Sequence, residues 1–143
     1  MNMAVNTNRS DDEQLEDMIQ RKGKTAPRVT PADIENAIAS EHYFTASDGV
    51  VGVLAIGDAA GKKPGDRVAV SIAEDIPVSL DLLTFCVLIL RNGFTVTGES
   101  ACASPENFDA EIGRKIARQN AVSKIWPLEG YLLKQKLHDG EGF

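Results

Sequence analysis

Two β-rich runs, residues 83–91 and 94–100, are separated by Asn92 and Gly93 and restrict the possible folds most strongly. Asn-Gly between two such runs is typical of a hairpin with a type I′ turn, in which both central residues take positive φ. The first run is apolar on both faces, so we expect it at the centre of its sheet. The second run alternates between apolar and polar residues, which leaves one face of its strand polar.

A long helix is expected after this hairpin. Ser104, Pro105 and Glu106 supply a hydroxyl N-cap, a proline at the first helical position and an acid in the first turn. Pro127 is expected to kink or break the helix after Trp126, so that residues 128–137 form a second amphipathic segment. One stripe at helical spacing is expected to pack on the sheet: Phe108, Ile112, Ile116, Gln119, Ser123 and Trp126.

The opposite stripe of this helix mixes charged and apolar residues. Arg114 and Arg118 lie one turn apart, where two guanidinium groups can hold successive phosphate oxygens. The alternative is that Arg114 pairs with Glu111 or another acid and that Arg118 is solvated. Val122 and Ile125 would be exposed on this stripe, which predicts helix pairing between protomers and a shared pocket where the arginines meet the hairpin. The full stripe is Asn107, Glu111, Arg114, Arg118, Val122 and Ile125.

Polar side chains on the second strand are further candidate ligand-binding groups. Thr95, Thr97 and Glu99 share one face and can offer hydroxyl and carboxylate partners to ribose hydroxyls or to a base. The alternative is that they are ordinary exposed strand residues. Phe94, beside them, is either a surface on which a base stacks or a core residue.

The N-terminal residues 1–28 contain few apolar side chains and are expected to form a flexible polar tail, with a frayed helix through residues 12–22. A helix is expected to begin at Thr30, with Pro31 at its first position and one face formed by Ile34, Ala37 and Ile38. Beyond it the pattern predicts a strand at 42–45, a turn at 47–49, a strand at 50–56, an exposed loop at 57–66 and a strand at 67–72.

These patterns together predict a single α+β domain over residues 29–143. We expect a small antiparallel sheet with the Asn-Gly hairpin, packed on long C-terminal helices, and a short N-terminal helix.

The charge of the chain is concentrated in its middle. Fifteen basic and 21 acidic residues give a net charge of −6, which disfavours long nucleic acids and anionic membranes as partners. Residues 29–82 hold three basic and nine acidic residues, whereas the segments on either side are each neutral. A small phosphate-bearing ligand is therefore not excluded near the two arginines. An alternative function is a phage accessory protein whose acidic segment binds a basic host protein.

No motif in the chain indicates catalysis. Cys86 and Cys102 lack the spacing of a zinc site and are interpreted as small apolar residues. The segment 57–63 resembles a phosphate-binding loop, but only three residues separate its glycines and Lys63 replaces the magnesium-binding hydroxyl. His42 is interpreted as a partly buried structural residue, with a hydrolytic base as the alternative. The longest apolar run, 85–90, is far shorter than the roughly 20 residues that span a bilayer. We expect a soluble protein that is not an enzyme and needs no cofactor or metal.

Residues 90–109, 113–118 and 125–126 resemble the phage gene-product forty-nine/sixty-six family, and the resemblance extends over roughly residues 29–137. Some proteins of similar pattern look like the first-described Thoeris anti-defence proteins. The resemblance implies a sheet packed on long C-terminal helices, assembly into dimers or hexamers, and action in the host cytoplasm. It also implies binding of cyclic ADP-ribose isomers without cleavage, and of cyclic oligonucleotides at separate sites between subunits. Arg114 and Arg118 match the two arginines of the nucleotide pocket.

Overall fold

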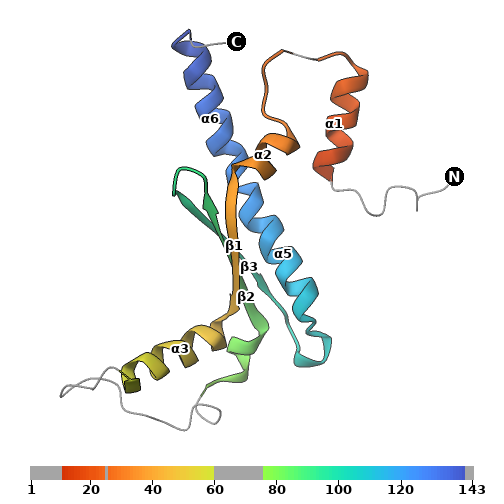
Figure 1. Cartoon of the computed structure of the whole chain (residues 1–143). Coiled ribbons are helices and arrows are strands. Elements are labelled where there is room, and N and C mark those ends of the chain that lie inside the picture. Colours follow the sequence, from red (N-terminus) through yellow and green to blue (C-terminus); the bar gives the residue numbers. More distant parts are fainter. Residues whose placement is uncertain (1–10, 25, 60–75, 141–143) are drawn as a thin grey trace, which may run out of the picture. The chain divides into compact units, whose positions relative to one another are not determined.

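The computed structural model describes residues 11–24, 26–59 and 76–140 of the 143-residue chain (Figure 1). Its contacts divide the chain into two compact units, Met1–Ile38 with Ile125–Phe143, and Ala39–Lys124. The elements in chain order are helices α1 (Asp11–Arg21) and α2 (Pro31–Ala37), strand β1 (Ile38–Thr45), helix α3 (Ala46–Ala59), the 3-10 helix η2 (Val78–Leu82), strands β2 (Leu83–Leu90) and β3 (Thr95–Ala101), the 3-10 helix η3 (Pro105–Asn107), and helices α5 (Ala110–Ser123) and α6 (Ile125–His138).

The sheet has three strands in the order β1-β2-β3, so β2 is central as its apolar faces predict. β2 and β3 pair antiparallel, in a register that runs from Leu83 opposite Ala101 to Ile89 opposite Thr95. Alternate residues of β2 are buried: Thr84, Cys86, Leu88 and Leu90. The α+β class with a small antiparallel sheet and a long C-terminal helix is therefore confirmed.

The connection between β2 and β3 differs from the predicted type I′ turn. The amide of Gly93 donates to the Leu90 carbonyl at 2.9 Å, and the Leu90 amide donates to the Phe94 carbonyl at 2.7 Å. Gly93 has φ +90°, whereas no residue other than glycine has positive φ in the part of the chain that the structure describes. Three residues, 91–93, therefore form the tip, and only Gly93 takes the left-handed conformation. The prediction of positive φ at Asn92 is wrong, because the additional tip residue makes it unnecessary.

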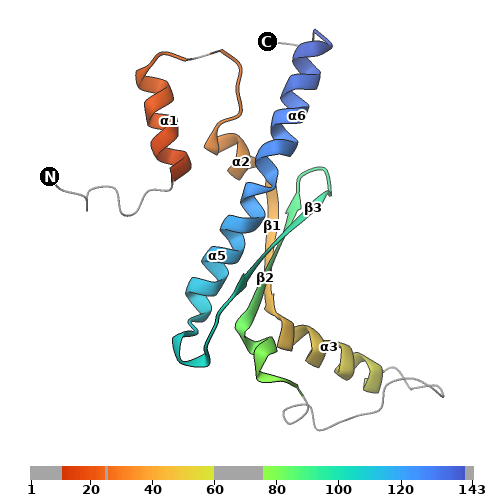
Figure 2. The same cartoon turned by 180° about the vertical axis from the view of Figure 1, so that it is seen from behind.

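Helix α5 covers one face of β2 and β3 (Figures 1 and 2). The helix packs through the small residues Gly113, Ala117 and Ala121, which are buried. A Cβ atom on Gly98 of β3 would lie 2.2 Å from the Ala117 oxygen and 2.2 Å from the Ala121 nitrogen, so the helix backbone lies directly on this glycine.

The predicted packing stripe of this helix is wrong. Ile112 and Ile116 are 56% and 41% exposed instead of facing the sheet. The packed face consists instead of the small residues Gly113, Ala117 and Ala121, because they allow the backbones of helix and strand to approach more closely than isoleucine side chains would.

Both ends of α5 differ from the prediction. Ser104 precedes the 3-10 helix η3 and makes no side-chain cap, whereas the Asp109 carboxylate accepts from the Ile112 amide at 3.0 Å and caps α5. At the other end α5 stops at Ser123, and α6 begins at Ile125, before Trp126. Pro127 lacks the amide that would bond to the Ser123 carbonyl, so the break lies several residues ahead of the proline.

Residues 46–59 form a helix, so the predicted turn at 47–49 and strand at 50–56 are wrong. The Thr45 hydroxyl accepts from the Asp48 amide at 3.1 Å, and the Asp48 carboxylate accepts from the Thr45 amide at 2.9 Å. This reciprocal cap starts a helix despite the valine-rich sequence that follows. The predicted loop begins inside α3 at residues 57–59, and its remainder and the predicted strand at 67–72 lie outside the described residues.

The first compact unit contains α1, α2 and α6. The predicted helix start at Thr30 is confirmed, because Thr30 and Asp33 form a reciprocal cap at the start of α2. Ile34, Ile38 and Ile125 are buried, and α2 contacts both α1 and α6. Helix α1 occupies most of the range in which the sequence predicts a frayed helix within a polar tail.

Candidate functional site

An arginine and a glutamate join α5 to β1 in the second unit. The Arg118 guanidinium donates from Nε to Oε1 of Glu41 at 3.1 Å and from Nη2 to Oε2 at 2.9 Å. The Tyr43 hydroxyl donates to the same Oε1 at 2.6 Å. The Arg118 and Glu41 side chains are 29% and 35% exposed. We refer to Glu41, Tyr43 and Arg118, with the buried Cys86 beside them, as the Arg118 cluster.

The charge state of this cluster follows from its contacts. The hydrogen bonds from Arg118 lower the pKa of Glu41, and burial opposes them only in part. Burial, aided by the hydrogen bond to Glu41, raises the pKa of Tyr43 well above its ordinary value. Burial likewise raises the pKa of Cys86. At neutral pH the cluster therefore holds one ion pair with a protonated phenol and a protonated thiol, and Cys86 is not an activated nucleophile.

Arg114 lies one turn before Arg118 and is exposed. Its guanidinium has no hydrogen bond or ion pair with any residue in the described ranges. Glu111, which the sequence suggested as a partner of Arg114, instead forms an ion pair with Lys115 at 3.3 Å. Arg118 is paired with Glu41 and not solvated. The sequence alternatives for both arginines are therefore wrong, and α5 presents one anchored arginine and one arginine without a partner in the described residues.

Glu41 and Tyr43 are the residues that sequence reasoning missed. Glu41 lies 77 positions from Arg118, so no local spacing connects them. The available signal is strand alternation: an acid and a tyrosine two residues apart on β1 share the face on which α5 packs.

The polar residues of β3 lie on the other side of the sheet. Thr95, Thr97 and Glu99 are exposed and alternate with Val96 and Gly98, which face α5. A single copy of the chain therefore does not bring these three side chains together with Arg114 and Arg118. We call this side, with its β1 and β2 residues, the outer sheet face; its members are Ser40, His42, Phe44, Phe85, Val87, Ile89, Thr95, Thr97 and Glu99.

The structure also shows the positions of two further aromatic residues and of the histidine that the sequence singled out. Phe94 is 55% exposed next to the tip of the β2–β3 connection, so the core interpretation is wrong. Phe44 stacks on Phe85 with ring centroids 5.4 Å apart. His42 is exposed, with its Nε2 3.1 Å from the Ser40 hydroxyl, and is not the partly buried residue that we expected.

The residues from which helix pairing was expected are not exposed apolar residues. Ile125 is fully buried, and Val122 is half-buried. Exposed apolar side chains lie elsewhere on the C-terminal helices: Ile112, Ile116, Tyr131, Leu132 and Leu137.

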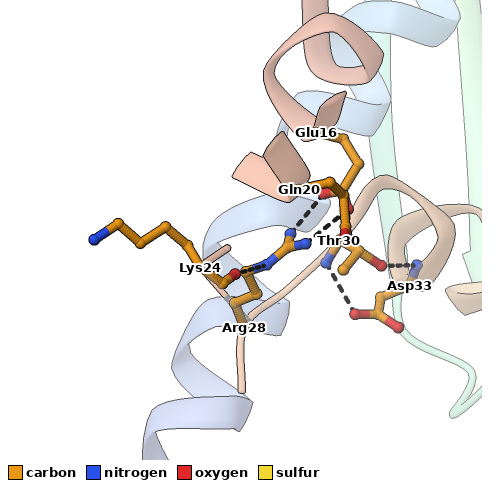
Figure 3. A network of polar contacts seen from close by, with 6 residues as sticks. All are labelled: Glu16, Gln20, Lys24, Arg28, Thr30 and Asp33. Carbon is orange, nitrogen blue, oxygen red and sulfur yellow. Dashed lines mark hydrogen bonds and ion pairs between the residues drawn. The ribbon is translucent and has the colours of Figure 1, made fainter. Parts of the chain in front are cut away.

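A second charged network lies in the first unit (Figure 3). Arg28 donates to Glu16 through two nitrogens at 2.5 Å and 2.7 Å, and Gln20 donates to Glu16 at 2.9 Å. These bonds lower the pKa of Glu16 to about 2. Glu16 also borders a hollow of about 240 Å³ between α1 and the start of α2. These bonds join side chains of α1 to Arg28, so the network fastens α1 to the segment before α2.

Neither a metal site nor a membrane span is found in the described parts of the chain. Over residues 11–24, 26–59 and 76–140, no three His, Cys, Asp or Glu side chains are grouped so that they could hold a metal ion. Within the same ranges, no helix combines the length and apolar character needed to cross a bilayer.

Fold and site define a small α+β protein that presents two arginines one turn apart on a helix packed against a three-stranded sheet. The chain belongs to the phage protein (N4 Gp49/phage Sf6 gene 66) family, whose model matches residues 29–137. That range contains Arg114, Arg118 and Glu41, and α1 lies before it. No curated protein and no solved structure matches the chain.

Proposed function

We propose that this phage protein binds and sequesters cyclic nucleotide immune signals in the host cytoplasm without cleaving them. Cyclic ADP-ribose isomers are the first candidates, and cyclic oligonucleotides are the second. Membership of a phage protein family supports a role during infection. The sequence resemblance to Thoeris anti-defence proteins supports the ligand class.

The observation that carries the proposal is the difference between the two arginines. Arg118 is held in one orientation by Glu41, so little side-chain entropy remains to be lost when a phosphate binds beside it. Arg114 is exposed one turn away and can move to a second phosphate oxygen. Glu41 also offsets the repulsion between two like charges at this spacing. Capture at sub-micromolar concentration requires about −8 kcal/mol, which several charge-assisted bonds and base stacking can supply.

The proposed site needs more than one copy of the chain. Thr95, Thr97 and Glu99 lie on the outer sheet face, away from the arginines. If these residues contact the ribose or base of the same ligand, a second copy must supply them. The proposed working unit is therefore a homo-oligomer, a dimer or a hexamer, in which α5 of one copy lies near β3 of another.

Calorimetric titration of the purified protein with cyclic ADP-ribose isomers tests this function. We expect binding, and recovery of the intact ligand after the protein is denatured by heat. Arg114→Ala should weaken binding at least tenfold, whereas Lys115→Ala, the adjacent exposed cation on α5, should change it less than twofold. Arg118→Lys keeps a charge beside Glu41 but loses the planar fork, so it should weaken binding with little loss of stability.

Other outcomes would contradict the proposal in distinguishable ways. Absence of binding to every isomer and cyclic oligonucleotide would reject the ligand class. Recovery of cleaved ligand would indicate a hydrolase, for which His42 is the base to test. Co-purification with a host protein and no nucleotide would favour the accessory-protein alternative. That alternative has less structural support, because Asp33 and Asp48 of the acidic segment cap helices and Glu41 pairs with Arg118.

A further inference from the structure

Helix α1 is docked on its unit without a buried side chain. None of its 11 residues is buried, and Leu15 and Met18 are 55% and 45% exposed. In α5, by contrast, Gly113, Ala117 and Ala121 are buried against the sheet. A segment with few buried apolar contacts opens at a much lower free energy than the core of a domain. Polar contacts therefore supply most of what holds α1 in place.

One of these contacts is built around Arg28, on the segment between α1 and α2 (Figure 3). Its guanidinium donates from Nη1 and Nη2 to the two carboxylate oxygens of Glu16, and Gln20 donates to the same carboxylate. Nε of Arg28 donates to the Lys24 carbonyl at 3.2 Å. The same guanidinium thus contacts both α1 and the chain that leaves it. We call Glu16, Gln20, Lys24 and Arg28 the Arg28 latch.

A second polar contact joins α1 to α6. The half-buried indole of Trp126 donates from Nε1 to the Asp12 carboxylate at 3.1 Å. Trp126 is the single tryptophan of the chain, so its fluorescence reports whether α1 is docked.

Both ends of α1 are completed by groups close in sequence. Three acidic residues occupy its first turn, where they favour the positive end of the helix dipole. At the other end the Lys24 amide donates to the Ile19 carbonyl at 3.2 Å. Gly23, with φ +66°, donates from its amide to the Gln20 carbonyl at 3.1 Å, which completes a Schellman motif. Helix α1 therefore needs no group of α2 or α6 to end its backbone, and it can separate from them as a unit.

We propose that α1 is a salt-sensitive strap, which leaves α2 and α6 when the Arg28 latch opens while the rest of the fold stays intact. The Arg28 and Glu16 side chains are each 22% exposed, so ions in solution compete with their pairing. Release uncovers the Trp126 indole and the first turn of α2, which borders the hollow beside α1. The family model matches from residue 29 onward, which agrees with a fold that does not require α1. This inference goes beyond the proposed function, since it needs neither a ligand nor a second copy of the chain.

Hydrogen exchange of the full chain, measured by peptide mass spectrometry, tests the strap. At low salt we expect the amides of α1 to be protected, but less than those of β2 and α5. Raising sodium chloride from about 0.1 M to about 1 M shortens the Debye length from about 10 Å to about 3 Å. Exchange in α1 should then become at least tenfold faster, because an isolated helix of 11 residues is marginal in water, and exchange in β2 and α5 should not change.

A matched pair of variants separates the latch from a general effect of salt. Arg28→Gln removes the charge of the latch, so it should speed exchange in α1 at least tenfold at low salt. Lys22→Gln removes an exposed cation just beyond α1 and should change exchange less than twofold. The fluorescence of Trp126 should shift to longer wavelength in Arg28→Gln, and in the native protein at high salt, because the indole loses its partner and becomes more exposed to water.

Three results would overturn the inference. In the first, α1 exchanges as slowly in Arg28→Gln as in the native protein, and the Trp126 emission is unchanged. In the second, α1 is already unprotected in the native protein at low salt, so that no latch holds it. In the third, β2 and α5 lose protection together with α1, which would mean that the whole domain opens and that α1 is not a separate strap.

Discussion

The two faces of the sheet use the same strands and yet differ in how closely they are packed. On the α5 side, Gly98 lies directly against the backbone of α5. On the same side, the Arg118 cluster joins α5 to β1. On the outer sheet face, Thr97, the residue next to Gly98, is exposed. Neighbouring residues of one strand therefore have different roles, since one packs against α5 and the next is exposed. Substitutions on the α5 side should lower the stability of the fold, whereas substitutions on the outer sheet face should leave it nearly unchanged.

Gly98→Ala should have the largest effect on stability. The added Cβ would meet the Ala117 oxygen and the Ala121 nitrogen at 2.2 Å, and backbone atoms cannot rotate away. We expect a loss of about 3 kcal/mol or more in urea denaturation. Gly52→Ala, where a Cβ meets nothing within 4 Å, is the control and should be neutral or stabilising.

A second substitution in the helix distinguishes this explanation from ordinary overpacking. Replacing Ala117 or Ala121 by glycine should not rescue Gly98→Ala, because the clash is with backbone and not with their methyl groups. Recovery of stability in either double variant would contradict the backbone contact.

Glu41→Ala should have the next largest effect, through the ion pair that joins β1 to α5. Removing the carboxylate leaves Arg118 and Tyr43 without their shared acceptor. Because both ionic side chains are about one-third exposed, solvent screening limits the loss to about 1 kcal/mol. Glu99→Ala on the outer sheet face is the matched control and should change stability by less than about 0.5 kcal/mol. Equal losses in the two variants would reject a structural role for the Arg118 cluster.

The stability of the protein at acid pH should depend on the same ion pair between Glu41 and Arg118. The pKa of Glu41 is lowered in the folded protein, so its stabilising contribution is fully present above the unfolded value of about 4.3 and is lost as the pH falls through the folded value. The contribution of Glu16 should be lost in the same way, as the pH falls toward about 2. Melting temperatures measured from pH 6 to pH 2 should therefore fall less steeply in Glu41→Gln and Glu16→Gln than in the native protein. Profiles parallel to the native one would contradict the two pairings.

Much of this arrangement could be predicted from local sequence, and the exceptions have separate causes. The central position of β2 follows from its apolar run, and the start of α2 follows from Thr30 and Asp33, because both signals are contained in one segment. Residues 50–56 of α3 were predicted to form a strand because valine and isoleucine favour strands. The reciprocal cap between Thr45 and Asp48 starts a helix there instead.

The candidate site was harder to predict because its geometry depends on residues that are distant in sequence. The spacing of Arg114 and Arg118 identifies a possible anion site, but the partner of Arg118 is 77 positions away on another element. The packed side of α5 was also misassigned, since Ile112 and Ile116 are the more apolar residues. A hydrophobic pattern alone does not show that Gly98 offers space for a close backbone contact.

The two cysteines should differ in reactivity because they differ in burial. Cys86 is fully buried beneath α5 and its pKa is raised, so its thiolate is both rare and inaccessible at neutral pH. Cys102 is half-buried beyond the end of β3, where its thiol donates to the Ser104 carbonyl at 3.2 Å. Titration with a thiol reagent should therefore label Cys102 at least tenfold faster than Cys86 in the folded protein, and both at similar rates in urea. Faster labelling of Cys86 would indicate that α5 opens readily.

The smallest expected effect on stability, from Thr97→Val, is the most informative about function. Valine has the shape of threonine without the hydroxyl, and Thr97 is exposed on a strand, so the free energy of unfolding should change by less than about 0.5 kcal/mol. If a second copy supplies the outer sheet face to the ligand, the same substitution should weaken binding of a cyclic ADP-ribose isomer several-fold, because a ribose hydroxyl loses its partner. The measurement is calorimetric titration of the Thr97→Val and Lys115→Ala variants in parallel. Equal affinities would place the ligand on the arginine side alone, and the proposed site would then be complete within a single chain.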